Sequence, residues 1–384
     1  MTNNRGVNKE FKMKTYIWSL PTRLFHWLLV AFIVISYLSS DEESFLTIHA
    51  AFGYGVFVLI LFRIIWGFIG PKYSKFSDFV LDFKEAKEFA LNIFNPKKEY
   101  AGHNPAASFV MLGIIIVTLL VTISGVLTYG IQEGRGVFAF LNNSFFKEME
   151  LLKELHEVFV NLLIILVLAH LGGVFSDYIL HKEQGVLRSI FNGYKNIKAQ
   201  SIKLNFFQIV VATIFLATAI AVPIITLTTN TPLTKSVYKK IDYESKNSNF
   251  VNECASCHTL YLPHLLPKSS WVKLMKPKEL LNHFGDDASL DEETRADIES
   301  FLVANSSENS TKEAAFYIGQ KVKNKDIIAI TKTPYWKKRH ENIAKEVFES
   351  KKVRSRANCK ACHSDIEKGL IEDINIKIPK EDSK

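Results

Sequence analysis

All four cysteines of the chain lie in two copies of one arrangement, CASCH at residues 254–258 and CKACH at residues 359–363. Two thiols at this spacing can form thioethers with the vinyl groups of a haem, and the histidine that follows can bind its iron. A zinc ribbon would place its cysteine pairs about 15 to 20 residues apart, whereas these pairs lie about 100 residues apart. A thioredoxin-like redox pair would need alternating strands and helices around it, and that pattern is missing. We therefore predict two covalent c-type haems on Cys254, Cys257, Cys359 and Cys362, with His258 and His363 as iron ligands.

Each c-type iron needs a sixth ligand, for which this part of the chain offers His264, His283, His340 and Met275. Apolar patterns of helical period at 290–303 and 336–350 predict a small, mostly α domain around the two sites. The stretch 229–249 is typical of a tether. Lysines in the tether and in 337–339 and 351–356 could steer an acidic redox partner, although a solvated face is the better explanation for them.

Four further histidines lie in or at the ends of long apolar stretches, where an imidazole finds no partner in hydrocarbon and therefore points to a function. His156 and His170 are 14 residues apart on one predicted helix, which is about 21 Å of rise and close to four full turns. Both rings thus share a face, with His156 level with His49 and His170 level with His26. Any one of them alone would be an ordinary hydrogen-bonded histidine. Together they predict two stacked b-type haems, each held between two imidazoles from facing helices.

Two alternatives concern the same stretches. Zinc is disfavoured at either histidine pair because no carboxylate or cysteine joins it. Arg63, deep in the second apolar stretch, fits a partner of a haem propionate, but a side chain that snorkels to the membrane surface would look the same.

The elements that must position these histidines are membrane helices. Residues 1 to about 230 contain five apolar runs long enough to cross about 30 Å of hydrocarbon, and we place them at 22–40, 48–69, 107–129, 153–180 and 205–228. Asn104 can cap the third helix, with Pro105 in its first turn. The net charge of +8 forms no basic stripe with interleaved aromatic residues, so nucleic-acid binding is excluded.

Orientation follows from the distribution of lysine and arginine in the short flanks. Five lie before Leu24, six between Gly70 and Pro105, and five between His181 and Asn205, whereas the opposite flanks carry only Arg135 and Lys147. We expect a bacterial inner-membrane protein with a cytoplasmic N-terminus, and with everything after about Thr229 in the periplasm. The first apolar run could also be interpreted as a cleavable signal peptide. Cleavage would remove His26, which the predicted haem site needs.

Four segments of the first half, WSLPTRLFHW (18–27), HAAFGYGVFVLILFRIIWGFIGPKYSKFSDF (49–79), GHNPAAS (102–108) and LHEVFVNLLIILVLAH (155–170), resemble the bacterial cytochrome b561 and nickel-hydrogenase cytochrome b family over about residues 14–195. The resemblance implies a four-helix bundle that exchanges electrons with membrane quinone and binds two haem b groups through His26, His49, His156 and His170. Ser19 stands where the family usually has an acidic residue, and the fifth helix is an addition. His103 and His181 match family positions, and we expect hydrogen-bonding roles for them.

The segments NECASCHTLYLPHLLPKSSWVKLM (252–275), NHFGDDASLD (282–291), TPYWKKRH (333–340) and NCKACHSDIEKG (358–369) resemble the dihaem cytochrome c family over about residues 248–370. This resemblance implies bis-histidine ligation of both c haems, with His283 and His340 as the distal ligands. It does not say which of the two serves which haem. His264 is then a surface or near-haem histidine, and Met275 a core residue.

The predicted fold is all-α: a four-helix transmembrane bundle with two haem b groups (1–200), a fifth transmembrane helix (201–230), a linker (231–247) and a periplasmic domain with two haem c groups (248–384). We expect an electron carrier, without catalytic residues of its own, between membrane quinol and a soluble periplasmic redox protein. Reverse flow from a hydrogenase-like periplasmic donor into quinone stays open. A terminal reductase of oxygen or nitrogen oxides would need a five-coordinate c haem, and a redox sensor would need a signalling module. The oligomeric state is not fixed, and a homodimer is allowed.

Overall fold

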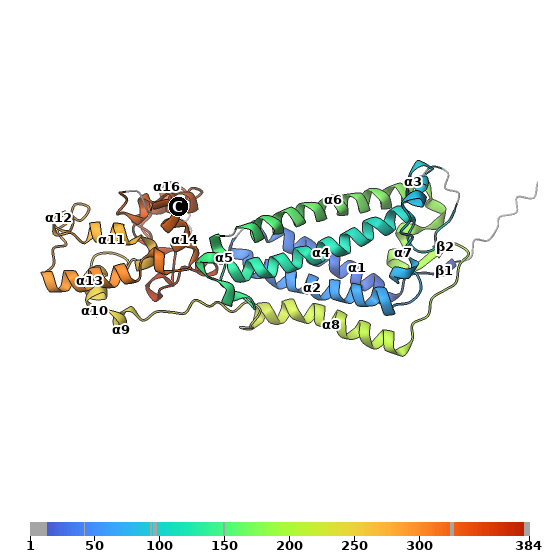
Figure 1. The fold of residues 1–384 in the computed structure, drawn as a ribbon, viewed down its shortest axis with the longest axis horizontal. Helices are drawn as coiled ribbons and strands as arrows, with labels where there is room; N and C mark the ends of the chain where they lie inside the picture. Colours follow the sequence, from blue (N-terminus) through green and yellow to red (C-terminus); the bar gives the residue numbers. More distant parts are fainter. Residues whose placement is uncertain are drawn as a thin grey trace, which may run out of the picture. The chain divides into compact units, whose positions relative to one another are not determined.

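The computed structural model describes residues 14–41, 43–92, 94, 98–148, 150–322 and 326–379. The basic residues that precede Lys14, together with Glu42 and Lys97, lie outside these ranges. Five helices are long and apolar enough to cross a membrane, and they confirm the predicted spans to within about two residues. They are α1 (Leu20–Leu38), α2 (Leu46–Ile69), α4 (Pro105–Ile131), α6 (Leu151–Leu180) and α8 (Phe206–Thr228), and Figure 1 shows them running in roughly one direction.

Side-chain caps begin three of these helices, and the cap at Asn104 is the one that the sequence predicts. The Asn104 side chain accepts a hydrogen bond from the backbone N–H of Ala107 at 2.8 Å, and Pro105 is the first residue of α4. Asn205 and Gln208 form a reciprocal capping box at the start of α8. Ser19 caps α1. Each cap satisfies N–H groups that a helix start leaves without an intrahelical partner.

The described chain divides into two compact units, and the first contains the five long helices, with residues 14–41, 46–128 and 151–231. Apolar side chains of α1, α2 and α8 form its largest buried cluster. At one end, strand β1 (Lys14–Tyr16) pairs antiparallel with β2 (Tyr194–Asn196), close to the short helix α7 (Val186–Asn192). We call this the β end of the bundle, and it also carries α3 (Phe83–Leu91).

The second unit contains residues 43–45, 129–148, 150 and 232–379 of the described chain. Its short helices are α5 (Ser144–Glu148), α9 (Tyr243–Lys246), α10 (Ser248–Cys254), α11 (Lys268–Leu274), α12 (Pro277–Leu280), α13 (Glu292–Ala304), α14 (Glu313–Val322), α15 (Pro334–Arg339) and α16 (Lys345–Glu349). One apolar core runs through it and includes Trp271, Ile298 and Trp336. The segment 290–303 is helical as predicted, but 336–350 is not one helix. Helix α15 ends at Arg339, which leaves His340 at its C-cap.

Residues 129–150, which connect α4 and α6, pack within this second unit. Lys147 is 1% exposed, and its Nζ donates to the backbone oxygen of Thr311. The Tyr238 hydroxyl bonds Asn142 at 3.0 Å and Thr311 at 2.7 Å. Arg135 forms an ion pair with Glu372. The stretch expected to be a tether is therefore held by defined contacts, and the α4–α6 connection is a structural part of the second unit.

Candidate haem sites

Helices α1, α2 and α6 bring the four bundle histidines together in the two predicted pairs. The rings of His26 and His170 have their centres 6.4 Å apart. The rings of His49 and His156 have theirs 6.2 Å apart. Since both partners lie on α6, four helical turns separate the pairs along the bundle.

These separations fit a metal ion held between two imidazoles. A metal–nitrogen bond to histidine is about 2.0 Å, and the ring centre lies about 1 Å behind the nitrogen, so two opposed ligands have ring centres about 6 Å apart. Two rings in direct contact would have their centres closer together. Two unrelated histidines would have no reason to lie at this separation. Two imidazoles at this spacing could hold one iron between them.

Hydrogen bonds at the His49/His156 pair fix which ring nitrogen is available. Nδ1 of His49 lies 2.8 Å from the backbone oxygen of Ser36 on α1. Nδ1 of His156 lies 3.0 Å from the backbone oxygen of Val121 and 3.1 Å from the Ser124 hydroxyl on α4. Because a carbonyl can only accept, Nδ1 carries the proton in both rings and Nε2 keeps the lone pair that binds metal.

Gly125 on α4 makes this arrangement possible. A Cβ at this position would lie 2.9 Å from Cε1 and 3.3 Å from Nδ1 of His156. A methyl group could not occupy that space without displacing the ring. The small Ser124-Gly125 pair inside an apolar helix was a sequence signal for this approach, and sequence reasoning missed it.

Arg63 of α2 is 4% exposed and belongs to the β end of the bundle. Its Nη1 donates to the backbone oxygen of Ser74 at 3.1 Å, and the guanidinium lies 5.2 Å from the ring centre of Phe76. The side chain is thus enclosed by protein and does not extend into water. In the same region, the Thr22 hydroxyl forms a hydrogen bond with the Ser19 hydroxyl. The Thr22 hydroxyl also accepts a hydrogen bond from the indole N–H of Trp66.

The two flanking histidines expected to form hydrogen bonds differ from each other. Nδ1 of His181 bonds Asp177 at 2.8 Å, as predicted. His103 packs between Trp18 and Phe79, with ring centres 5.0 Å away on each side, and its Nδ1 has no hydrogen-bond partner among the described residues. Burial lowers the pKa of His103 to about 3, so its ring is neutral.

In the second unit each of the two candidate distal histidines lies beside the histidine of one motif. His283 lies beside His258 of CASCH, with ring centres 6.3 Å apart and rings inclined by 21°. His340 lies beside His363 of CKACH, with ring centres 6.1 Å apart. Both separations again match two axial ligands, and sequence spacing alone could not have made this assignment.

Backbone carbonyls orient one ring of each of these pairs. Nδ1 of His258 donates to Thr259 at 2.7 Å, and Nδ1 of His340 donates to Trp336 at 2.8 Å. The Trp336 indole also stacks on the His340 ring at 4.2 Å. Burial lowers the pKa of His340, which favours the neutral ring that a metal requires.

The four cysteines are free thiols in the structure, and none pairs in a disulfide. Burial raises the pKa of Cys254 to about 12 and that of Cys359 to about 11, so these two thiols stay neutral. The sulfur of a thioether is also uncharged, so the buried positions of these two cysteines fit thioether bonds to haem.

The remaining candidates for a sixth ligand are core residues. Met275 is 4% exposed and packs in the apolar core, as expected. His264 is 5% exposed, which rules out a surface position for it. Burial lowers its pKa to about 3, with Lys312 as a further cause. It follows Pro263 in a short 3-10 turn of the core, a position that could not be predicted from sequence patterns.

Direct hydrogen bonds join the two c-type motifs. The hydroxyl of Tyr261, whose ring stacks on His258 at 4.6 Å, donates to the backbone oxygen of Ala357 at 2.9 Å. The backbone N–H of Lys360 lies 3.5 Å from the Thr259 hydroxyl. The two sites are therefore neighbours across about 100 residues of sequence.

Comparison with known proteins agrees with this geometry. Residues 17–193 match the family model of prokaryotic cytochrome b561, and residues 250–371 match that of dihaem cytochrome c. The chain joins a cytochrome b561 segment to a dihaem cytochrome c segment. These matches and the five apolar helices support a multi-pass membrane protein for electron transfer, and the two families imply b and c haems.

Individual relatives cover one segment each. The probable Ni/Fe-hydrogenase 1 B-type cytochrome subunit of Escherichia coli K12 is 26% identical over 150 residues, a match that covers 32% of this chain and 64% of the relative. The chain thus spans less than two thirds of that relative. The dihaem cytochrome c of Rhodobacter sphaeroides is 38% identical over 32% of this chain and 94% of its own, with a TM-score of 0.29. The dihaem cytochrome c of Shewanella baltica OS155 is 30% identical over 35% and 94%, with a TM-score of 0.28.

Proposed function

We propose that this cytochrome carries electrons from membrane quinol to a soluble redox protein on the far side of the bacterial inner membrane, using two haem b and two haem c groups. The observation that supports this most directly is the set of four histidine pairs, whose ring centres lie between 6.1 and 6.4 Å apart. A haem held by two histidines has no open coordination site and supplies one-electron chemistry without substrate activation. The proposal therefore assigns no catalytic residue to the chain.

In the bundle, His26 and His170 would hold the haem at the β end, and His49 and His156 would hold the other. The Ser36 and Val121 carbonyls keep Nδ1 of His49 and His156 protonated, which leaves the lone pair of Nε2 in each ring for the metal. Arg63 stays a candidate for a propionate partner, because this buried cation at the β end has N–H groups beyond the one that bonds Ser74.

In the second unit, Cys254 and Cys257 would attach one haem and Cys359 and Cys362 the other, with the ligand pairs His258/His283 and His340/His363. The bonds from Tyr261 and Thr259 to the CKACH segment hold the two sites next to each other. This proximity suits electron transfer from one haem c to the other within the protein.

The proposed orientation places the β end in the cytoplasm and the second unit in the periplasm. It rests on the basic flanks around β1, α3 and α7, which follow the positive-inside rule. We keep the proposed domains at 1–200, 201–230, 231–247 and 248–384. Within them, residues 129–150 connect two bundle helices yet pack with the fourth domain.

Reduction by a quinol analogue in isolated membranes tests the proposal. The absorption bands of b and c haems should both appear on adding the quinol, with the c bands lost selectively when the CASCH and CKACH cysteines are replaced by alanine. If neither set of bands responded to quinol, electron donation from quinol would be refuted.

Reverse flow is the second candidate, and the hydrogenase cytochrome subunit among the relatives is the observation that favours it. A reduced periplasmic donor would then feed the c haems, and quinone added to membranes should reoxidise the b haems. A terminal reductase would instead need a c haem without its distal ligand. Purely low-spin spectra and no reaction with carbon monoxide would remove that alternative.

A further inference from the structure

The surface next to His283 combines exposed apolar side chains with a candidate haem ligand. Leu281 is 63% exposed and Phe284 is 59% exposed. The Phe284 ring packs edge-on against His283 with ring centres 4.9 Å apart. Phe284 also has a φ of 58°, a conformation that is unusual for a bulky residue. The chain thus holds a large aromatic ring in water, beside an iron ligand, at a cost in backbone energy.

Carboxylates border this apolar surface, which we call the His283 face. Asp286 and Asp287 follow directly in the same turn, and both are exposed. The backbone N–H of His283 donates to the Asp286 carbonyl at 2.7 Å, so this turn is tied to the ligand. The next acidic residues along the chain are Asp291, Glu292, Glu293 and Asp297.

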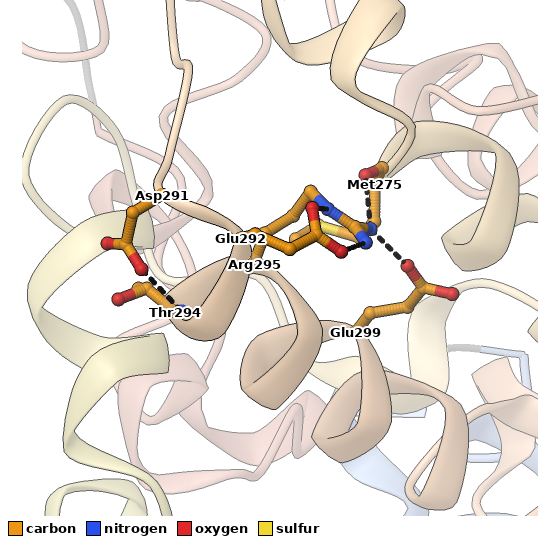
Figure 2. A network of polar contacts seen from close by, with 6 residues as sticks. All are labelled: Met275, Asp291, Glu292, Thr294, Arg295 and Glu299. Carbon is orange, nitrogen blue, oxygen red and sulfur yellow. Dashed lines mark hydrogen bonds and ion pairs between the residues drawn. The ribbon is translucent and has the colours of Figure 1, made fainter.

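Exposed Lys276 and Lys278 precede the His283 face in sequence, whereas Arg295, within the acidic stretch, is paired with carboxylates of its own helix. Figure 2 shows Arg295 of α13 bonded to Glu292 and Glu299, and also to the backbone oxygen of Met275. Asp291 is used as the N-cap of α13 and accepts from Thr294. Within the turn that carries His283 and Phe284, the exposed charges are those of Asp286 and Asp287.

The His340/His363 site has the opposite character. Exposed cations in the segments that carry this site outnumber the exposed acids Glu341, Glu346, Glu349 and Glu367; they include Lys337, Lys338, Arg339, Lys345, Lys351, Lys352, Arg354, Arg356 and Lys360. Part of its surroundings is also occupied by other protein segments. Ile376 pairs with the His363 backbone, Arg339 pairs with Asp373 at 3.3 Å, and Arg135 from the α4–α6 connection pairs with the neighbouring Glu372. A redox protein that approaches from solution therefore meets the exposed apolar surface at His283.

We infer that the soluble redox partner docks on the His283 face and presents a basic surface around its own cofactor. The inference rests on the proposed function, which it extends by naming the docking surface and the partner's charge. Leu281 and Phe284 supply the apolar contact that excludes water at the centre of an interface. Asp286 and Asp287 raise the rate of encounter with a cation-rich partner, and salt screens this effect over about 10 Å at 0.1 M.

The test uses the full chain in nanodiscs, reduced with dithionite that is then removed, so quinol takes no part. Stopped-flow spectroscopy follows its oxidation by a basic soluble cytochrome c at low and at high ionic strength. The doubly charge-reversed variant Asp286→Lys/Asp287→Lys should lower the second-order rate constant about tenfold at low salt and much less at high salt. Phe284→Ser should lower the rate constant at both salt concentrations.

Lys337→Glu/Lys338→Glu is the matched control, because it reverses two exposed charges beside His340. It should change the rate constant by less than about twofold. The same soluble cytochrome with succinylated lysines should react slowly with the wild-type chain and faster with Asp286→Lys/Asp287→Lys. Unaltered c-band spectra show that the variants are folded.

The inference is overturned if the Asp286/Asp287 reversal leaves the rate constant unchanged while the Lys337/Lys338 reversal alters it. That outcome would place docking at the His340/His363 site and would say nothing against quinol oxidation. Failure of quinol to reduce the haems in membranes would contradict the proposed function and leave this rate test unaffected.

Discussion

Replacing Gly125 by alanine should raise the reduction potential of one b haem. The added Cβ would lie 2.9 Å from Cε1 of His156, whereas non-bonded carbons rest at about 3.5 to 4.0 Å. The ring must therefore retreat by about 0.6 to 1 Å. Nδ1 is 3.0 Å from the Val121 oxygen, so the same movement takes this bond beyond hydrogen-bonding distance.

The size of the shift follows from the lost bond. A neutral hydrogen bond contributes about 0.5 to 1.5 kcal/mol net. Donation from Nδ1 makes the imidazole a stronger donor to iron and favours the oxidised state. If about 0.5 to 1 kcal/mol of this favours the oxidised state, the midpoint rises by about 20 to 40 mV, because 1.36 kcal/mol equals 59 mV for one electron.

Redox titration of the two b haems, followed by low-spin electron paramagnetic resonance, measures the effect. Gly113→Ala is the control on the same helix α4, because its Cβ would meet Leu166 at 3.4 Å, an ordinary contact. Both variants change helix propensity by the same amount, so the difference between them isolates the contact with His156. Equal potentials in the two variants, with unchanged resonance spectra, would refute the role of Gly125.

Three further predictions concern the second unit. His283→Ala should leave one c haem five-coordinate and able to bind carbon monoxide, His340→Ala should do the same to the other, and carbon monoxide difference spectra of the single and double variants will count the sites. Cys359→Ala with Cys362→Ala should lower covalently bound haem from two groups per chain to one, measured as the pyridine haemochrome. Burial raises the pKa of Glu313 from 4.5 to about 7, so the folded state binds the extra proton and stability falls as pH rises from 4.5 to 7, by at most about 3 kcal/mol. Denaturant titrations at pH 5.5 and 8 should show a smaller difference in stability for Glu313→Gln than for the wild type. An equal difference in both proteins would contradict the role of Glu313.

The bundle could be predicted from the sequence because its helices and the spacing of its histidines depend on residues close together in the chain. Apolar length sets the spans, and the periodicity of one helix places His156 and His170 on one face. The partners His26 and His49 follow from depth in the membrane alone. Hydrogen-bond acceptors could not be foreseen, since Ser36 and Val121 act through backbone oxygens that any residue would supply.

The second unit was predicted less completely, because its sites depend on contacts between distant segments. The CxxCH motifs are local and were found, but the partners of His258 and His363 come from turns whose positions the apolar core sets. The stretch 336–350 showed a helical pattern, yet the helix stops before His340. This break is what lets the His340 ring fold back onto Trp336.

The histidine pairs differ in the hydrogen bonds that their Nδ1 atoms make. This difference predicts which of the two b haems has the lower reduction potential. Both rings of the His49/His156 pair donate to backbone carbonyls. Nδ1 of His26 is buried without a hydrogen-bond partner among the described residues. The doubly donating pair is the stronger electron donor, so its haem should be the harder one to reduce. Gly125→Ala then identifies the bands, because the b haem that shifts in this variant should be the one of lower potential. A shift of the higher-potential haem would show that factors other than these hydrogen bonds set the order.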